Sequence, residues 1–187
     1  EGGAIVTNDE KLYDNLLKYR LHGMSKGAAE RHTEKYQHWD MEFLGYKCNM
    51  SDIQASLLVP QLKTIEKNLQ ARENICKQFE KAFSDLNGIK FPKVLKRTKH
   101  ARHLFTVWVD SSKRDEIIYK LESANIGVAV NYRAIHLLSY YKNIFGFSKG
   151  ILPKAEMIGD STITLPMYLK MTDTEIKYVI DVMKKAI

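Results

Sequence analysis

The chain has 187 residues, 44% of them hydrophobic, which excludes a disordered polypeptide and favours one domain with a sizeable core or two small lobes. Its 29 Lys and Arg residues outnumber 22 Asp and Glu residues, and the net charge of +7 favours acidic partners such as phosphates, nucleotides or nucleic acid. No apolar run is long enough to cross a bilayer and no signal segment opens the chain, so a soluble, cytoplasmic protein without a membrane partner is expected.

The first fifty residues are expected to form a strand, a helix and a long loop. Residues 2–7 have the apolar character of a short buried strand. Thr7 and Glu10 have the spacing of a capping box, which predicts a helix that ends at about residue 21, before Gly23. Residues 24–48 show little periodicity, and loops of this length tend to be functional or disordered.

A very long amphipathic helix is predicted next. Ser51 and Gln54 form a second capping box, and a cap of this kind contributes about 1 kcal/mol. Pro60 is expected to kink the helix, because proline lacks the backbone N–H. Taken alone, an apolar stripe of this kind most often marks a scaffold helix between two subdomains. The stripe comprises Leu62, Ile65, Leu69, Cys76, Phe79, Phe83 and Leu86.

A compact α/β lobe is expected to begin after Asn87-Gly88, where strands and helices start to alternate. The pattern predicts strands at 104–109, 126–132 and 163–165, and helices around Ile117, over 134–145, after Pro153 and over the last fifteen residues. Thr172 and Glu175 form a third capping box at the start of that terminal helix.

Few residues carry a chemical signature by spacing alone. Gly2-Gly3 lacks the glycine spacing and the lysine of a phosphate loop, and the histidines do not cluster as metal ligands, so no metal is expected. Cys48 and Cys76 are interpreted as free thiols. The basic run over 93–102 fits a solvated loop better than a nucleic-acid site, because it has no interleaved aromatic residues.

His136 is the one histidine with a suggestive neighbour. Arg133 precedes it by one helical turn, and such a pair can bind an anion or a carboxylate. The alternative, which spacing alone favours, is a histidine that caps or packs near a helix start.

Five motifs together resemble the C-terminal half of the DegT/DnrJ/StrS family of sugar aminotransferases, and the resemblance covers essentially the whole chain. In order along the chain they are EGGAIVTND, GYKCNMSDIQASLLVPQL, HLFTVWVD, IGVAVNYRAIHLLSYY and IGDSTITLPMYLKMTDTEIKYVIDVM. The resemblance implies an α/β fold, the C-terminal part of a fold-type I enzyme that uses pyridoxal 5'-phosphate. Residues 1–50 would close the large domain with its last strand, a helix and an active-site loop. Residues 51–87 would be the connecting helix and 88–187 the small C-terminal α/β domain.

The family's reaction transfers an amino group, usually from glutamate, to a keto sugar linked to a nucleotide, here a 4-keto-6-deoxy sugar for surface polysaccharide or glycan. Family members are homodimers with shared active sites. The Schiff-base lysine precedes the segment that matches Glu1-Gly2-Gly3, so no catalytic residue is assigned here and the chain alone is expected to be inactive. A non-catalytic dimerisation or regulatory fragment of the same fold is the alternative function, and a nucleic-acid-binding module is the third.

Three site residues follow from the resemblance. Asn49 aligns with the asparagine that reaches the partner's cofactor phosphate, and an amide can donate to a phosphate oxygen without adding charge. Its other possible role is to hydrogen-bond the loop that leads into Ser51. Tyr132 and His136 lie in the motif that approaches the substrate in similar enzymes and are assigned to substrate binding.

Overall fold

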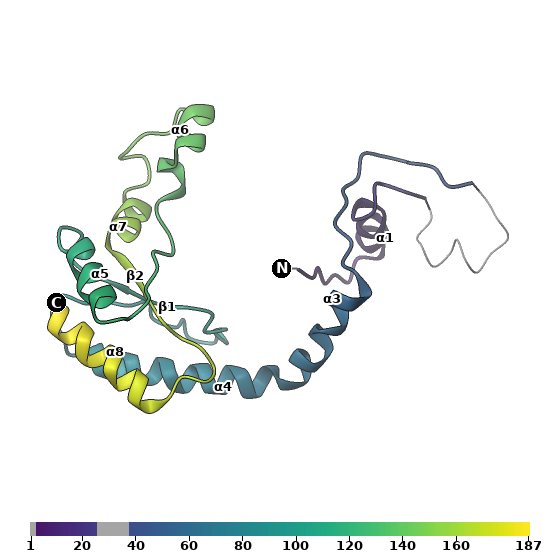
Figure 1. Cartoon of the computed structure of the whole chain (residues 1–187). Helices are drawn as coiled ribbons and strands as arrows, with labels where there is room; N and C mark the ends of the chain where they lie inside the picture. The colour runs from purple at the N-terminus through teal and green to yellow at the C-terminus, as the bar shows by residue number, and fades with distance from the viewer. Residues whose placement is uncertain (1–2, 26–37) are drawn as a thin grey trace. The chain divides into compact units, whose positions relative to one another are not determined.

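A computed structural model of the chain describes residues 3–25 and 38–187 (Figure 1). Its described helices and strands are α1 (Glu10–Tyr19), α3 (Asp52–Ser56), α4 (Leu58–Phe83), β1 (Phe105–Trp108), α5 (Arg114–Ser123), the 3₁₀ turn η1 (Ile135–Leu137), α6 (Ser139–Phe145), α7 (Pro153–Ser161), β2 (Thr162–Leu165) and α8 (Asp173–Ala186). The chain divides into two compact units, residues 1–63 and 64–187.

In the first unit, helix α1 ends against the returning segment 38–48. Gly23 adopts φ +69°, and its N–H donates to the Lys18 carbonyl at 2.9 Å, which closes the helix. A Cβ on Gly23 would lie 1.9 Å from the Phe43 carbonyl oxygen, and one on Gly45 would lie 2.1 Å from the Gly23 nitrogen. The two backbones are therefore in direct contact, which only glycine permits at these positions.

Two predictions for this unit are wrong. Residues 3–7 form no strand: Ile5 is 72% exposed and Val6 92% exposed, and no described residue pairs with them. A strand requires a hydrogen-bonded neighbour, which the local pattern cannot supply.

The predicted capping box of Thr7 and Glu10 is replaced by a different cap. The cap of α1 is Asp9, whose side chain accepts from the Leu12 N–H at 3.0 Å, while Thr7 accepts from the Asp9 N–H. Residues 26–37 of the predicted loop lie outside the described residues.

The second capping box is confirmed, but the long helix is interrupted. The Ser51 side chain accepts from the Gln54 N–H, and the Gln54 side chain accepts from the Ser51 N–H. Helix α3 ends at Ser56, and α4 begins at Leu58 with Pro60 in its first turn. The break replaces the predicted kink, because proline is tolerated where a helix begins and its missing N–H is not needed.

The core lies in the second unit. The buried face of α4 comes only from its C-terminal half, where Ile75, Cys76, Phe79 and Phe83 are buried. They pack with both strands, α5 and α8 in one hydrophobic cluster. Burying each such side chain contributes about 1.5–3 kcal/mol. The third capping box, Thr172 with Glu175, is present at the start of α8.

The sheet of this unit is small and antiparallel. Strand β1 pairs with β2 in the register Phe105 to Leu165, and single bridges add Lys90 beside Trp108 and Ala129 beside Thr164. The predicted strand over 126–132 is therefore not formed, and only a single β-bridge, at Ala129, is present in this range. The predicted helix over 134–145 is η1 followed by α6, with Leu138 extended between them.

Candidate functional site

The motif around His136 forms a buried hydrogen bond to a carboxylate in the second unit. His136 lies in η1 and is 5% exposed, and its Nε2 is 2.9 Å from Oε1 of Glu156 in α7. The same carboxylate oxygen accepts from the backbone N–H of Gly150 at 2.7 Å. Hydrogen bonds from His136 and from the Gly150 backbone hold the pKa of the Glu156 carboxyl below its usual value, so Glu156 is ionised at neutral pH.

A glycine brings these two residues together. A Cβ on Gly159 would lie 2.6 Å from the backbone nitrogen of Ala134, so α7 packs directly on the segment that enters η1. Glu156 precedes Gly159 by three residues, which places both on the same face of α7. Close packing of α7 at Gly159 therefore places the Glu156 carboxylate within hydrogen-bonding distance of the His136 imidazole.

Tyr132 and Arg133 lie just before this pair, and both are exposed. Their segment is tied to β2, because Ala129 bridges Thr164 and the Asn131 N–H donates to Thr164 Oγ1 at 3.3 Å. No hydrogen bond or ion pair of the Arg133 side chain is seen among the described residues, and His136 is paired with Glu156. The packing alternative for His136 is thus observed, while the assignment of Tyr132 and His136 to substrate binding stays a prediction.

Asn49 belongs to the first unit and is exposed. The backbone is fixed on both sides of it: the Cys48 N–H donates to the Arg20 carbonyl at 2.9 Å, and Ser51 caps α3. Within residues 3–25 and 38–187, the Asn49 side chain makes no hydrogen bond, including none to the loop that leads into Ser51. An amide without a partner among these residues can donate to a cofactor phosphate, and this assignment remains a prediction.

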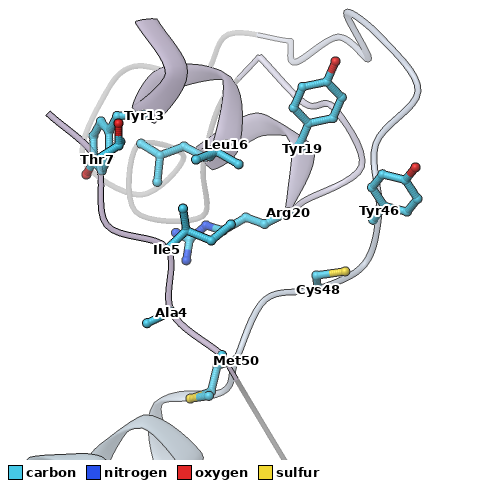
Figure 2. Close-up of a pocket in the computed structure, with 12 residues that line it drawn as sticks. Ala4, Ile5, Thr7, Tyr13, Leu16, Tyr19, Arg20, Tyr46, Cys48 and Met50 are labelled. Carbon is cyan, nitrogen blue, oxygen red and sulfur yellow. The ribbon is translucent and has the colours of Figure 1, made fainter. Parts of the chain in front are cut away.

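A cavity of about 880 Å³ lies beside Asn49 in the same unit. Figure 2 shows Cys48 and Met50, the two neighbours of Asn49, on the segment that borders it, with Arg20 beside Ile5. Three tyrosines, Tyr13, Tyr19 and Tyr46, also line it. Its lining combines apolar side chains with one guanidinium group.

The basic run over 93–102 is partly neutralised by α4. Arg102 is 6% exposed; its Nε donates to Glu73 at 2.6 Å and its Nη1 donates to Glu80 at 2.7 Å. Lys99 pairs with Glu66 at 2.6 Å, but both of those side chains are exposed. The run is thus a loop fastened to a helix, and two of its cations have carboxylate partners.

Other kinds of site are not seen in the part of the chain that the structure describes. Its His, Cys, Asp and Glu side chains form no group of three that could hold a metal ion. None of its helices is long and apolar enough to span a membrane. Cys48 and Cys76 are free thiols, as predicted, the first exposed and the second buried.

The family is decided by comparison with known proteins. The model of the DegT/DnrJ/EryC1/StrS aminotransferase family matches residues 1–184. The chain belongs to this family. It is 35% identical over 98% of its length to the spore coat polysaccharide biosynthesis protein SpsC of Bacillus subtilis, and it covers 49% of that protein. It is 30% identical over 97% of its length to a UDP-4-amino-4,6-dideoxy-N-acetyl-β-L-altrosamine transaminase of Campylobacter jejuni, covering 46% of it.

A solved structure of a sugar aminotransferase has the same fold. The putative sugar aminotransferase Spr1654 of Streptococcus pneumoniae, in its PMP form, superposes with a TM-score of 0.85 at 32% identity, covering 98% of this chain and 47% of that one. The chain spans about half the length of the relatives it matches. The α/β class and the family predicted from the motifs are therefore confirmed.

Sequence reasoning missed Glu156. It is twenty residues from His136, and the predicted short helix around it gave no reason to connect the two. The available signal was its isolation: Glu156 is the only acidic residue between Glu122 and Asp160. A single carboxylate in such a basic stretch is a natural partner for a histidine.

Proposed function

We propose that this chain is part of a pyridoxal-phosphate-dependent aminotransferase. In the full-length protein it would serve the transfer of an amino group, usually from glutamate, to a nucleotide-linked 4-keto-6-deoxy sugar in surface polysaccharide or glycan biosynthesis. The observation that carries the proposal is the family match over residues 1–184. Relatives named for polysaccharide biosynthesis and for an amino sugar transaminase support the sugar substrate.

Asn49 is proposed to hold the cofactor. When bound, pyridoxal 5'-phosphate supplies the electron sink for amino transfer. The amide of Asn49 would donate to a phosphate oxygen of the cofactor bound in the partner subunit of a homodimer. In the full-length protein, the lysine that binds the cofactor covalently is expected to precede the residue numbered Glu1 here.

Tyr132 and His136 are proposed to bind the sugar substrate. The phenol of Tyr132 is exposed and can stack on a sugar or donate to it, and His136 lies four residues further along the same motif. Residues 1–50, 51–87 and 88–187 are proposed to be the end of the large domain, the connecting helix and the small domain. A cytoplasmic homodimer with shared active sites completes the proposal.

The first test is the intact mass of the protein made from its native gene. A mass about twice that of this chain, as a two-domain enzyme requires, supports the proposal. That protein, with added pyridoxal phosphate, glutamate and a UDP-linked 4-keto-6-deoxy sugar, should yield the amino sugar, detected by mass spectrometry. A native product of 187 residues, or no amino transfer with the full-length protein, would contradict the proposal and favour a dimerisation or regulatory fragment.

A further inference from the structure

We propose that Glu156 is a positioning residue that fixes the orientation and protonation of His136, so that the Nδ1 atom of this histidine meets the sugar substrate. The inference rests on the proposed function, because it concerns how the same motif would recognise that substrate. Glu156 itself would not touch the substrate.

The carboxylate decides which ring nitrogen of His136 carries a proton. An ionised carboxylate only accepts hydrogen bonds, so the nitrogen that is 2.9 Å from Glu156 Oε1 must be the donor. In the neutral imidazole the proton is therefore on Nε2, and Nδ1 has a free lone pair. A carboxylate that orients a histidine in this way is a recurrent device around functional imidazoles.

The other ring nitrogen is open to a ligand. No hydrogen bond to His136 Nδ1 occurs among the described residues, yet this atom is not one of their fully buried unpaired polar atoms. Although His136 is buried as a whole, Nδ1 is therefore not fully shielded from solvent. As an acceptor, it can receive a hydrogen bond from a sugar hydroxyl.

Glu156 also closes the loop that follows α6. The oxygen that accepts from His136 accepts from the Gly150 N–H at 2.7 Å as well. The residues between these two anchors, from α6 to Lys149, are all exposed. One carboxylate therefore holds the histidine and the base of the exposed segment in a fixed relation, so its loss should disturb recognition of the sugar.

The first arm of the test uses this chain, labelled with ¹⁵N-histidine, at pH 8. The wild-type spectrum should show His136 protonated on Nε2, with an N–H signal that exchanges slowly with water. In Glu156→Ala this signal should be lost to fast exchange. A wild-type His136 protonated on Nδ1, or an Nε2–H that exchanges equally fast in both proteins, would overturn the inference.

The second arm uses the full-length protein and compares its two half-reactions. Glu156→Gln, which keeps the side-chain shape, should slow the half-reaction with the nucleotide-linked sugar by about tenfold or more, because the substrate contact is misplaced. The half-reaction with glutamate should keep its wild-type rate. A general structural defect would slow both half-reactions.

Glu175→Gln is the matched control. The Glu175 carboxylate accepts hydrogen bonds from Tyr168 and Thr172, three against the two at Glu156, but it caps α8 and contacts no proposed site residue. Its sugar half-reaction should match that of the wild type. If the Glu156 and Glu175 variants behave alike while the wild type is active, the inference alone fails. If the wild-type protein transfers no amino group, the proposed function fails and this inference fails with it.

Discussion

Asn49 and His136, both proposed to meet a ligand, are held in two different ways. The backbone of Asn49 is fixed by neighbouring hydrogen bonds while its amide has no described partner. His136 is fixed through its side chain, with one ring nitrogen bonded to Glu156. The first arrangement suits a contact that forms when the ligand arrives, and the second suits one whose geometry is set beforehand.

Replacing Asn49 by Ala in the full-length protein should weaken cofactor retention. The change removes one proposed hydrogen bond to a charged phosphate oxygen, a contribution of about 1.5–3 kcal/mol, which is roughly tenfold to a hundredfold in affinity. The measurement is a titration of the apo-protein with pyridoxal phosphate. Equal affinities of the variant and the wild type would contradict the assignment of Asn49.

The two cysteines should differ sharply in reactivity. Burial raises the pKa of the Cys76 thiol to about 11, whereas Cys48 is exposed. Since the thiolate is the reactive form, a thiol reagent at pH 7.5 should modify only Cys48 in the folded chain and both residues after unfolding. Peptide mapping identifies the modified residue, and Cys48→Ser is the control that should stay unmodified. Rapid modification of Cys76 in the folded chain would contradict this prediction.

At the scale of single elements, two of the three predicted capping boxes are present, whereas predictions that depend on pairing with distant residues failed. Ser51 with Gln54 and Thr172 with Glu175 satisfy backbone groups within one turn, so the sequence suffices. Residues 2–7 have strand character, but a strand exists only beside a partner. The site shows the same limit, since the pairing of His136 with Glu156 depends on how α7 packs.

The ion pairs that fasten the basic loop to α4 should contribute unequally to stability. Arg102→Met keeps the apolar stem but leaves Glu73 and Glu80 without their shared partner, and it should lower the free energy of unfolding by about 2–3 kcal/mol. Lys99→Met breaks the exposed pair with Glu66 and should cost under about 1 kcal/mol. Urea unfolding measures both, and equal losses would contradict the structure of this loop.

At the scale of the whole molecule, the hydrophobic core belongs to the second unit, and the carboxylates with lowered pKa values are found there as well. Hydrogen bonds to Arg102, to His136 and to the Thr172 cap hold the pKa values of Glu73, Glu156 and Glu175 below their usual value of 4.5. The folded state therefore favours the ionised form of each carboxyl group. Acid should therefore destabilise the folded state by protonating these three carboxylates.

Stability should fall as the pH decreases below about 4.5, because the unfolded chain then binds protons that the folded chain still excludes. The contribution of these carboxylates is complete above this pH and is lost as the pH falls through their folded-state pKa values. Urea unfolding at pH 7, 5, 4 and 3 measures the effect, and Glu175→Gln should show a shallower decline. A free energy of unfolding that is unchanged between pH 5 and 3 would contradict the prediction.

Hydrogen exchange should differ between the two halves of helix α4, because only its second half is anchored in the core. Leu62 and Ile65 are exposed, whereas Phe79 and Phe83 are buried. In this chain, amide hydrogens near Leu62 should exchange with deuterium through local fraying, and those near Phe79 only through opening of the core. One continuous helix would then show two exchange regimes, with the change between them falling between residues 65 and 75.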